Sequence, residues 1–237
     1  MPLELSGEGD VKGSNEQAMS NGIVVWGVGT TRTMRVHWMA HELGLDYETR
    51  RIESRSGETT EAEFTTQNPR QKIPLLVHRD LVLAESYAII HYLRGLADAL
   101  PYDDYQQSHH GQAKYDEWLS FILMELDATS LYVVRRHKDL HAIYGEAPAA
   151  VESSIEYFKR MLNAVDDRVS ADLPIWGSCF SELDILFTIS LDWASFLAIP
   201  LPDHIASYQA MMHERPAYQA ARVHNFRDLK IPTALPQ

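Results

Sequence analysis

A proline that opens a short apolar run, Pro74, most constrains what this chain of 237 residues folds into. It follows Lys72 and Ile73 and precedes the strand-like run 75–78. A peptide bond before proline adopts the cis form at little cost. A cis bond here would turn the backbone N–H and C=O of Ile73 outward, where an extended peptide can pair with them as an added strand. Lys72 would then lie beside a carboxylate of that peptide. An ordinary loop-to-strand proline is the alternative interpretation.

The segments around Pro74 predict a compact α/β unit. Apolar and β-branched runs predict strands, helical spacing of apolar residues before Gly44 predicts the first helix, and Arg79-Asp80 predicts a two-residue hairpin turn. The expected order is strand, helix, strand, short helix, two strands and helix. The strands are expected at 23–26, 45–52, 74–78 and 81–84, and the helices at 34–43, up to 68–69, and 86–96.

The rest of the chain has helical periodicity, and its helices are expected at about 109–137, 147–170, 181–197, 202–213 and 216–223. A polar stretch with a proline separates the two parts and predicts a linker. We therefore divide the chain into a flexible N-terminal extension, an α/β domain, a linker, an all-helical domain and a C-terminal tail. These span 1–21, 22–98, 99–108, 109–226 and 227–237.

Two strand-to-helix junctions carry polar groups suited to a ligand. At the second, Ser86 offers a hydroxyl and an N–H group at a positive helix start, and Glu85 adds a negative charge. This pair suits a zwitterion, with its carboxylate on the helix and its ammonium on Glu85. An ordinary helix cap beside a solvated acid is the alternative.

The first junction contains Thr30 and Thr31. A hydroxyl donor at a helix N-terminus can hydrogen-bond a thiolate and, with the helix dipole, lower a thiol pKa from about 8.5. Each unit of lowering favours the reactive anion by about 1.4 kcal/mol. The alternative is that the threonines merely cap the helix. The junction also imitates a dinucleotide-binding fingerprint, but Arg32 stands in place of its third glycine, which argues against nucleotide binding.

Together these three clusters resemble the glutathione transferase superfamily. The pattern Asn-Pro-x-x-Lys-Ile-Pro-x-Leu at 68–76, the pattern Glu-Ser-x-Ala-Ile-x-x-Tyr-Leu at 85–93 and the first junction follow the family's order and spacing. Downstream, 181–185 resembles the family's helix-capping box, and 214–218 resembles its Arg-Pro-Ala segment. The resemblance covers about 22–226. It implies a thioredoxin-like α/β N-terminal domain followed by an all-α C-terminal domain.

The resemblance also implies roles for individual residues. Thr30 or Thr31 would be the catalytic residue against the glutathione sulfur, and the sequence leaves open which one. Pro74 would be the cis-proline. Gln71 departs from the glycine that is usual before the lysine, and a threonine stands where a serine is usual. The glutathione-binding residues would be Arg32, Lys72, Ile73, Pro74, Glu85 and Ser86.

The implied activity is transfer to glutathione sulfur. The protein would activate the thiol as a thiolate and attack a small hydrophobic electrophile or a peroxide, as a cytoplasmic homodimer acting in detoxification. Glutathione is the expected co-substrate, and no metal is expected. The implied co-substrate pocket includes Tyr115, Trp118, Leu119 and Ile122, although this apolar stripe alone indicates a core or dimer face. The alternatives are a glutathione-dependent disulfide reductase or isomerase, and a non-enzymatic ligand-binding member of the fold.

Composition and residue spacing narrow the remaining classes of function. A formal charge of −12 argues against nucleic-acid binding, which needs a basic face. No apolar run reaches the length of a membrane span. Cys179 is the single cysteine, so an intrachain disulfide is impossible, and a reducing compartment fits best. His37 and His41 have a spacing that can bind a metal, but no third ligand is evident.

Overall fold

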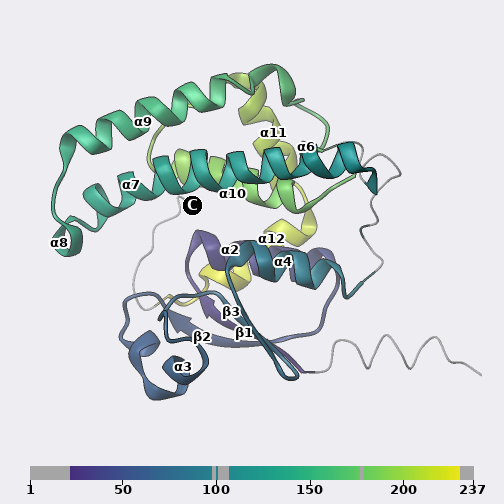
Figure 1. The fold of residues 1–237 in the computed structure, drawn as a ribbon, viewed down its shortest axis with the longest axis vertical. Helices are drawn as coiled ribbons and strands as arrows, with labels where there is room; N and C mark the ends of the chain where they lie inside the picture. Colours follow the sequence, from purple (N-terminus) through teal and green to yellow (C-terminus); the bar gives the residue numbers. More distant parts are fainter. Residues whose placement is uncertain (1–21, 98–99, 101–106, 177–178, 230–237) are drawn as a thin grey trace, which may run out of the picture.

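The computed structural model describes residues 22–97, 100, 107–176 and 179–229. The predicted extension 1–21, most of the predicted linker 99–108 and the end of the predicted tail lie outside these residues. The described chain forms an α/β layer and a helical layer (Figure 1). Helices α2 and α4 lie between the sheet and the long helices. This is the predicted fold class, a thioredoxin-like α/β part followed by an all-α part.

The α/β part follows the predicted order. Its sheet has the strand order β2-β1-β3-β4, in which β1 pairs parallel with β2 and antiparallel with β3, and β3 and β4 form the predicted hairpin. The elements are β1 (Ile23–Val28), α2 (Thr31–Glu42), β2 (Glu48–Glu53), a 3₁₀ turn η1 (Glu58–Thr60), α3 (Ala62–Gln67), β3 (Leu75–His78), β4 (Leu81–Ala84) and α4 (Ser86–Arg94).

The second strand begins later than predicted. The expected strand starts at Leu45, but the backbone N–H of Leu45 donates to the carbonyl of Ala40 at 3.0 Å, and Gly44 donates to His41 at 3.2 Å. These bonds close the end of α2, so 44–45 belong to a helix-terminating turn, which Gly44 allows with its φ of +60°. The strand then starts at Glu48.

The helical part consists of a long run of consecutive helical segments, a helix that runs back beside this run and a buried central helix. Its elements are α6 (His109–Ser120), η2 (Phe121–Leu131), α7 (Tyr132–Val134), η3 (Arg135–Asp139), α8 (His141–Tyr144), α9 (Pro148–Asn163), a 3₁₀ turn η4 (Asp166–Arg168), α10 (Glu182–Phe196), α11 (Asp203–His213) and α12 (Pro216–Phe226). The predicted helix at 109–137 is therefore one helical path to residue 139, but η2 and η3 have π-helical hydrogen bonding.

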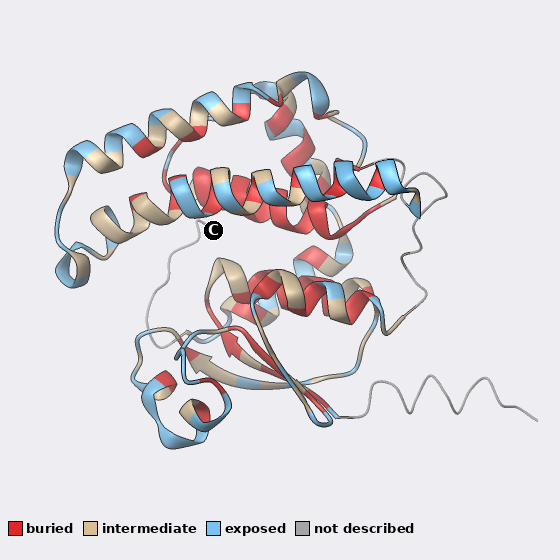
Figure 2. Ribbon diagram, viewed as in Figure 1, coloured by how far each residue is buried: buried red, intermediate tan, exposed pale blue. Residues whose placement is uncertain are grey.

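Helix α10 forms the centre of the helical part. It is buried on all sides over most of its length, as the red ribbon in Figure 2 shows. Its first turn carries the predicted capping box, because the backbone N–H of Ser181 donates to Asp184 Oδ2 at 2.7 Å. The other oxygen of Asp184 accepts from the backbone N–H of Ile175 at 2.7 Å and from the Tyr208 hydroxyl at 2.8 Å. None of the helices described is long and apolar enough to cross a membrane.

The two layers share one hydrophobic core and several ion pairs. Trp38 on α2 packs edge-on against Tyr218 on α12, with 4.8 Å between ring centroids. The Arg215 guanidinium holds the Glu42 carboxylate with two hydrogen bonds, at 2.6 and 2.8 Å. Arg94 on α4 donates to the fully buried carboxylate of Glu182 at 2.5 Å. These contacts fix the α/β layer against the helices, and thereby fix the space between them.

Candidate functional site

A cleft of about 340 Å³ lies between the α/β part and the helical part. On the α/β side it is lined by the β1–α2 junction, by the β2–α3 connection and by the loop before β3. Its helical wall comes from α7, η3, α8 and α10. Of the predicted site residues, the cleft brings together Thr30, Thr31, Arg32, Lys72 and Ile73.

The loop before β3 presents unpaired backbone groups to this cleft. The peptide bond between Ile73 and Pro74 is cis, as the resemblance implied. Within the part of the chain that the structure describes, the backbone N–H and C=O of Ile73 have no hydrogen-bond partner. The loop is held from behind, because the buried side chain of Asn68 donates to the Lys72 carbonyl at 2.8 Å. A free backbone edge in a held loop is suited to pairing with an extended peptide.

The loop also explains why glycine would be favoured at position 71. Gln71 has φ +55°, in the left-handed region where a side chain is unfavourable. The backbone N–H of Gln71 donates to the carbonyl of Asn68 at 3.0 Å, which holds this conformation. The departure from glycine therefore keeps the shape of the loop at some cost in stability.

Gly27 at the end of β1 contacts the same loop, and we predict that it does not tolerate a side chain. Gly27 has φ +112°, and an added Cβ would lie 2.6 Å from Ile73 Cβ. Gly27→Ala should therefore lower the free energy of unfolding by about 2 to 4 kcal/mol in urea titrations. Gly44→Ala is the matched control, because an added Cβ there meets no atom within 4 Å, and about 1 kcal/mol is expected. Equal costs for the two variants would contradict the proposed crowding.

The hydroxyl of Thr30 is engaged in capping α2. Its Oγ1 accepts from the backbone N–H of Thr33 at 3.0 Å, and the backbone N–H of Thr30 donates to Thr33 Oγ1 at 3.0 Å. This reciprocal pair forms a capping box. Asn225 on α12 fixes the same turn, because its Nδ2 donates to the Thr30 carbonyl at 3.1 Å and its Oδ1 lies 2.8 Å from Thr33 Oγ1.

Thr31 differs from Thr30 in its hydrogen bonding. Among the described residues, no partner is found for its hydroxyl, and the residue lines the cleft at the first position of α2. Thr31 therefore has the hydroxyl that is free to meet a ligand, whereas the structure supports the capping interpretation for Thr30. The sequence alone did not separate the two, because the separation depends on Thr33 and Asn225.

Beneath the cleft lies a buried carboxylate that the sequence did not reveal. Asp127 on η2 accepts from Arg32 at 2.5 Å and from the fully buried Arg35 at 2.7 Å. Burial favours the neutral carboxyl, but the two guanidinium groups outweigh it, so the pKa of Asp127 is lowered. Arg32 consequently reaches the cleft from a fixed position, with its guanidinium 4.8 Å from the centre of the Tyr132 ring.

Glu85 and Ser86 lie outside the lining of the cleft, and their local roles differ from the prediction. Glu85, not Ser86, occupies the cap position of α4, with φ +73°. Its exposed carboxylate accepts from Arg70 at 2.9 Å, and Arg70 lines the cleft. Ser86 is buried as the first residue of α4, and its hydroxyl accepts from Arg35 Nη1 at 3.2 Å.

The structure places the four predicted co-substrate residues in or against the helical core. Tyr115, Trp118 and Ile122 are buried, Leu119 packs beside them, and none of the four lines the cleft. Trp118 packs against Phe187 on α10, with 6.2 Å between ring centroids. These four residues miss the cleft because their side of the helix faces α10. The chain reaches the cleft only further along, at residues 132–144. The helical wall is formed instead by Tyr132, Arg135, Ile143, Tyr144 and Trp193.

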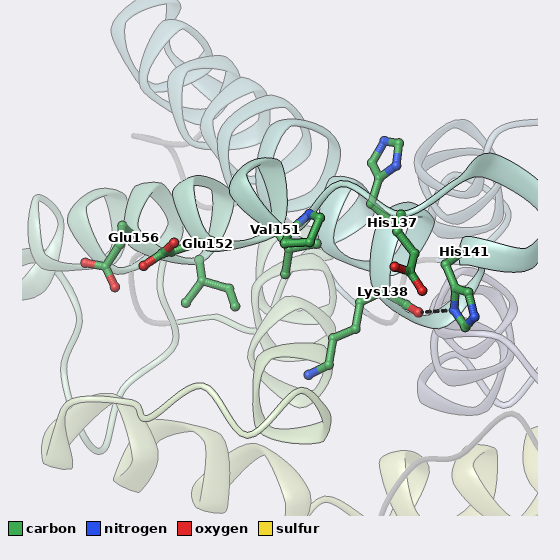
Figure 3. Close-up of a pocket in the computed structure, with 9 residues that line it drawn as sticks. His137, Lys138, His141, Val151, Glu152 and Glu156 are labelled. Carbon is green, nitrogen blue, oxygen red and sulfur yellow. Dashed lines mark hydrogen bonds between the residues drawn. The ribbon is translucent and has the colours of Figure 1, made fainter.

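A second cavity, of about 520 Å³, lies between α8 and α9 and shares no lining residue with the cleft (Figure 3). Val151, Glu152 and Glu156 of α9 line one side of it, and Lys138 and His141 the other. His141 Nδ1 lies 2.8 Å from the Lys138 carbonyl, so this ring is bonded to the backbone. Within the described ranges, no group of three or more histidine, cysteine or acidic side chains could hold a metal ion.

Comparisons with known proteins bear on the part of the chain around the cleft. The family model described as "Glutathione S-transferase, N-terminal domain" matches residues 20–95. Glutathione S-transferase 1 of Dianthus caryophyllus is 44% identical over 59 residues, which are 25% of this chain and 27% of that relative. Glutathione S-transferase TCHQD of Arabidopsis thaliana is 23% identical over 223 residues, 79% of this chain and 84% of that relative. The matched part of the first relative is thus about a quarter of its length.

The same fold occurs in solved structures. A glutathione transferase homologue from Lodderomyces elongisporus, with two GSH per subunit, superposes with a TM-score of 0.73 and 21% identity, over 85% of this chain and 97% of that one. The likeness extends the comparison from the α/β part to the helical part, and with it to both walls of the cleft.

Proposed function

We propose, from the premise that this chain belongs to the glutathione transferase superfamily, that it binds glutathione in the cleft and activates the thiol for attack on an electrophilic or peroxide co-substrate. The observation that carries the proposal is the unpaired Ile73 backbone beside the cis Pro74. It lies in the same cleft as Lys72 and the threonine junction. Several structural neighbours contain bound glutathione, which supports this choice of ligand.

In the proposed complex, the cysteinyl part of glutathione pairs with the Ile73 backbone as a short added strand. Lys72, which has no ion-pair partner among the described residues, binds one carboxylate. The γ-glutamyl end extends towards the first turn of α4, where the backbone and Glu85 receive its carboxylate and ammonium groups. Arg32 borders the same ligand from α2. Because Ser86 already accepts from Arg35, we assign its contribution to the backbone N–H group.

The chemical step begins with the thiol of bound glutathione. Its proton passes to solvent, and the thiolate is stabilised by the Thr31 hydroxyl and by the positive N-terminus of α2. In a conjugation reaction, the sulfur electron pair forms a bond to carbon and the leaving group departs with the electrons of its own bond. A hydrogen bond to a charged acceptor is worth about 1.5 to 3 kcal/mol, so the threonine accounts for part of the activation.

The two threonines should respond differently to substitution. Thr31→Ala should lower kcat/KM with a chloronitrobenzene substrate about 10- to 100-fold and raise the pKa of bound glutathione, followed by ultraviolet absorbance of the thiolate. Thr31→Ser keeps the hydroxyl and is the matched control. Thr30→Ala should mainly lower the free energy of unfolding, by about 1 kcal/mol, because it removes a helix cap. Unchanged thiolate formation in Thr31→Ala would refute the assigned role.

Calorimetry separates the proposal from a non-enzymatic binder. A transferase should bind glutathione, whereas a ligand-binding member should bind apolar ligands at micromolar concentration and glutathione weakly or not at all. A disulfide-exchange assay separates it from a glutathione-dependent reductase or isomerase. The proposal includes a homodimer, which light scattering on the purified protein tests, and a cytoplasmic location. It also keeps 22–98 and 109–226 as the two domains.

A further inference from the structure

The cleft has an excess of positive charge that glutathione alone does not use. Five basic side chains line it, and no acidic side chain among the described residues does so. This contrasts with the whole chain, whose formal charge is −12. The five basic residues are Arg32, Arg55, Arg70, Lys72 and Arg135. A concentration of one charge against the overall balance raises the local concentration of oppositely charged ligands.

Only some of these charges have a partner. Arg32 is paired with Asp127 and Arg70 with Glu85. The other three basic residues are Arg55, Lys72 and Arg135. Among the described residues, the guanidinium of Arg55 donates a hydrogen bond only to the hydroxyl of its neighbour Ser54, at 3.0 Å. Lys72 and Arg135 make no ion pair within 4.0 Å to a described residue. Three cations in the cleft are therefore left for ligands.

Arg135 is the half-buried member of these three. It begins η3 on the helical wall, while Arg55 belongs to the opposite, α/β wall. Burial lowers the pKa of the Arg135 guanidinium, and the positive charge of Arg55 lowers it further, while Asp139 on the same turn partly offsets this. The positive charge of Arg32 also lowers the pKa of Arg135, whereas Tyr132 raises it. An anion placed between Arg135 and Arg55 relieves this repulsion and replaces lost hydration.

The surroundings of Arg135 are aromatic and apolar. Tyr132 lies one turn before it, and Tyr144, Ile143 and Trp193 complete the wall. The indole Nε1 of Trp193 is buried and, among the described residues, has no hydrogen-bond partner. Flat apolar surfaces beside a cation fit a ligand that has an aromatic body and an acidic group.

The charges of glutathione account for one of the three cations. The tripeptide carries two carboxylates and one ammonium group. In the proposed complex, Lys72 binds one carboxylate and the first turn of α4 binds the other. We infer that Arg135, with Arg55 opposite, binds the acidic group of an anionic aromatic co-substrate, so that the protein prefers aryl electrophiles bearing a carboxylate. This inference rests on the proposed function.

A pair of matched substrates tests the inference. In 4-chloro-3-nitrobenzoate and 4-chloro-3-nitrobenzamide, glutathione sulfur forms a bond to the same ring carbon and chloride leaves with its bonding electrons, but only the first is an anion. We expect kcat/KM, divided by the uncatalysed rate constant of each substrate, to favour the benzoate about tenfold or more. This preference should decrease with rising salt concentration.

Substitution of Arg135 identifies the group responsible. Arg135→Gln should abolish the preference for the benzoate, because it should lower kcat/KM for the benzoate about tenfold more than kcat/KM for the benzamide. The loss of benzoate preference should exceed any loss of affinity for glutathione. Arg135→Lys should retain part of the preference. Arg160→Gln removes an exposed arginine of α9 that does not line the cleft, and it should change neither substrate.

If the substrates are conjugated, two results would overturn the inference. One is equal normalised turnover of the two substrates by the unmodified protein. The other is an equal loss of glutathione affinity and benzoate preference in Arg135→Gln, because Arg135 would then bind glutathione itself. If neither substrate is conjugated, the proposed function fails. Quenching of tryptophan fluorescence by the unreacted compounds still decides the inference, since benzoate binding about tenfold tighter than benzamide binding supports the anion site and equal binding refutes it.

Discussion

Replacing Asp127 by alanine should lower the free energy of unfolding by about 3 to 5 kcal/mol, which is a large part of the stability of an ordinary domain. The carboxylate is buried and accepts from Arg35 at 2.7 Å and from Arg32 at 2.5 Å. Arg35 is only 1% exposed, so its guanidinium cannot turn to water when the partner is lost. An unpaired buried charge is the origin of the expected cost.

Arg35 joins the two parts of the fold, so the effect should spread beyond its own position. It belongs to α2, its second donor contacts Ser86 on α4 at 3.2 Å, and Asp127 belongs to the helical part. Urea unfolding followed by circular dichroism measures the loss of stability. We also expect weaker binding of glutathione in Asp127→Ala, because Arg32 loses the partner that fixes it beside the cleft.

The control variants separate a buried charge from a surface pair. Glu156→Ala breaks the exposed pair with Lys159 and should cost less than about 1 kcal/mol. The double variant Arg35→Met/Asp127→Leu removes both buried charges and should recover most of the stability that Asp127→Ala loses. A double variant as unstable as Asp127→Ala would mean that the buried charge is not the source of the loss.

Asp127 also illustrates what the sequence could not indicate. Its partners lie 95 and 92 residues away, and no local pattern in 121–131 marks one acid as buried. The same holds for Asn225, which fixes the Thr30 turn from 195 residues away. Contacts between distant segments follow from how the two layers pack, and a single sequence does not encode that packing in any short pattern.

The parts that were predictable have local causes. The hairpin of β3 and β4 and the Ser181–Asp184 capping box are set by residues within a few positions of each other. The cis Ile73–Pro74 bond belongs to this group. The helical wall of the cleft does not, because its residues depend on how far the helical path rotates. The π-helical stretches η2 and η3 alter that rotation, so Tyr132 and Arg135 lie where a regular helix from 109 would not lead one to place them.

A second large effect should appear when the pH is lowered, and it arises from His37. This side chain is fully buried on α2, with Nε2 3.0 Å from the Gly27 carbonyl and Nδ1 2.9 Å from the Tyr47 hydroxyl. Because a carbonyl only accepts, Nε2 carries a proton. The lowered pKa of His37, about 3, keeps the ring neutral near pH 7, so Nδ1 then accepts from the Tyr47 hydroxyl. Its position links the end of β1, and therefore the Ile73 loop, to α2.

Burial lowers the pKa of His37 to about 3, against the opposing effect of the bond to Gly27. The nearby positive charges of His224, His41 and Arg51 lower this pKa further. In the unfolded chain, the pKa of a histidine is about 6.5. Because the folded state binds this proton less readily, the stabilisation is fully present above about pH 6.5 and is lost as the pH falls towards 3. The total loss from His37 is on the order of 5 kcal/mol.

Urea unfolding between pH 7 and pH 4 measures this dependence. Below about pH 6, His37 should contribute about 1.4 kcal/mol of lost stability for each pH unit. The pKa values of His41 and His224 are also lowered, mainly by burial, so the whole protein should show a steeper slope than one histidine provides.

The variant His37→Gln isolates the contribution of this one ring. Its amide can still donate to the Gly27 carbonyl, and we expect the variant to be less stable at pH 7 by about 1 to 3 kcal/mol. Between pH 6 and pH 4, the slope of its unfolding free energy against pH should be smaller by about 1.4 kcal/mol per pH unit, the contribution of one proton. His110→Gln changes an exposed histidine of α6 and should leave the slope unaltered. Since the slope counts protons taken up on unfolding, identical slopes for His37→Gln and the unmodified protein would show that His37 is protonated in the folded state.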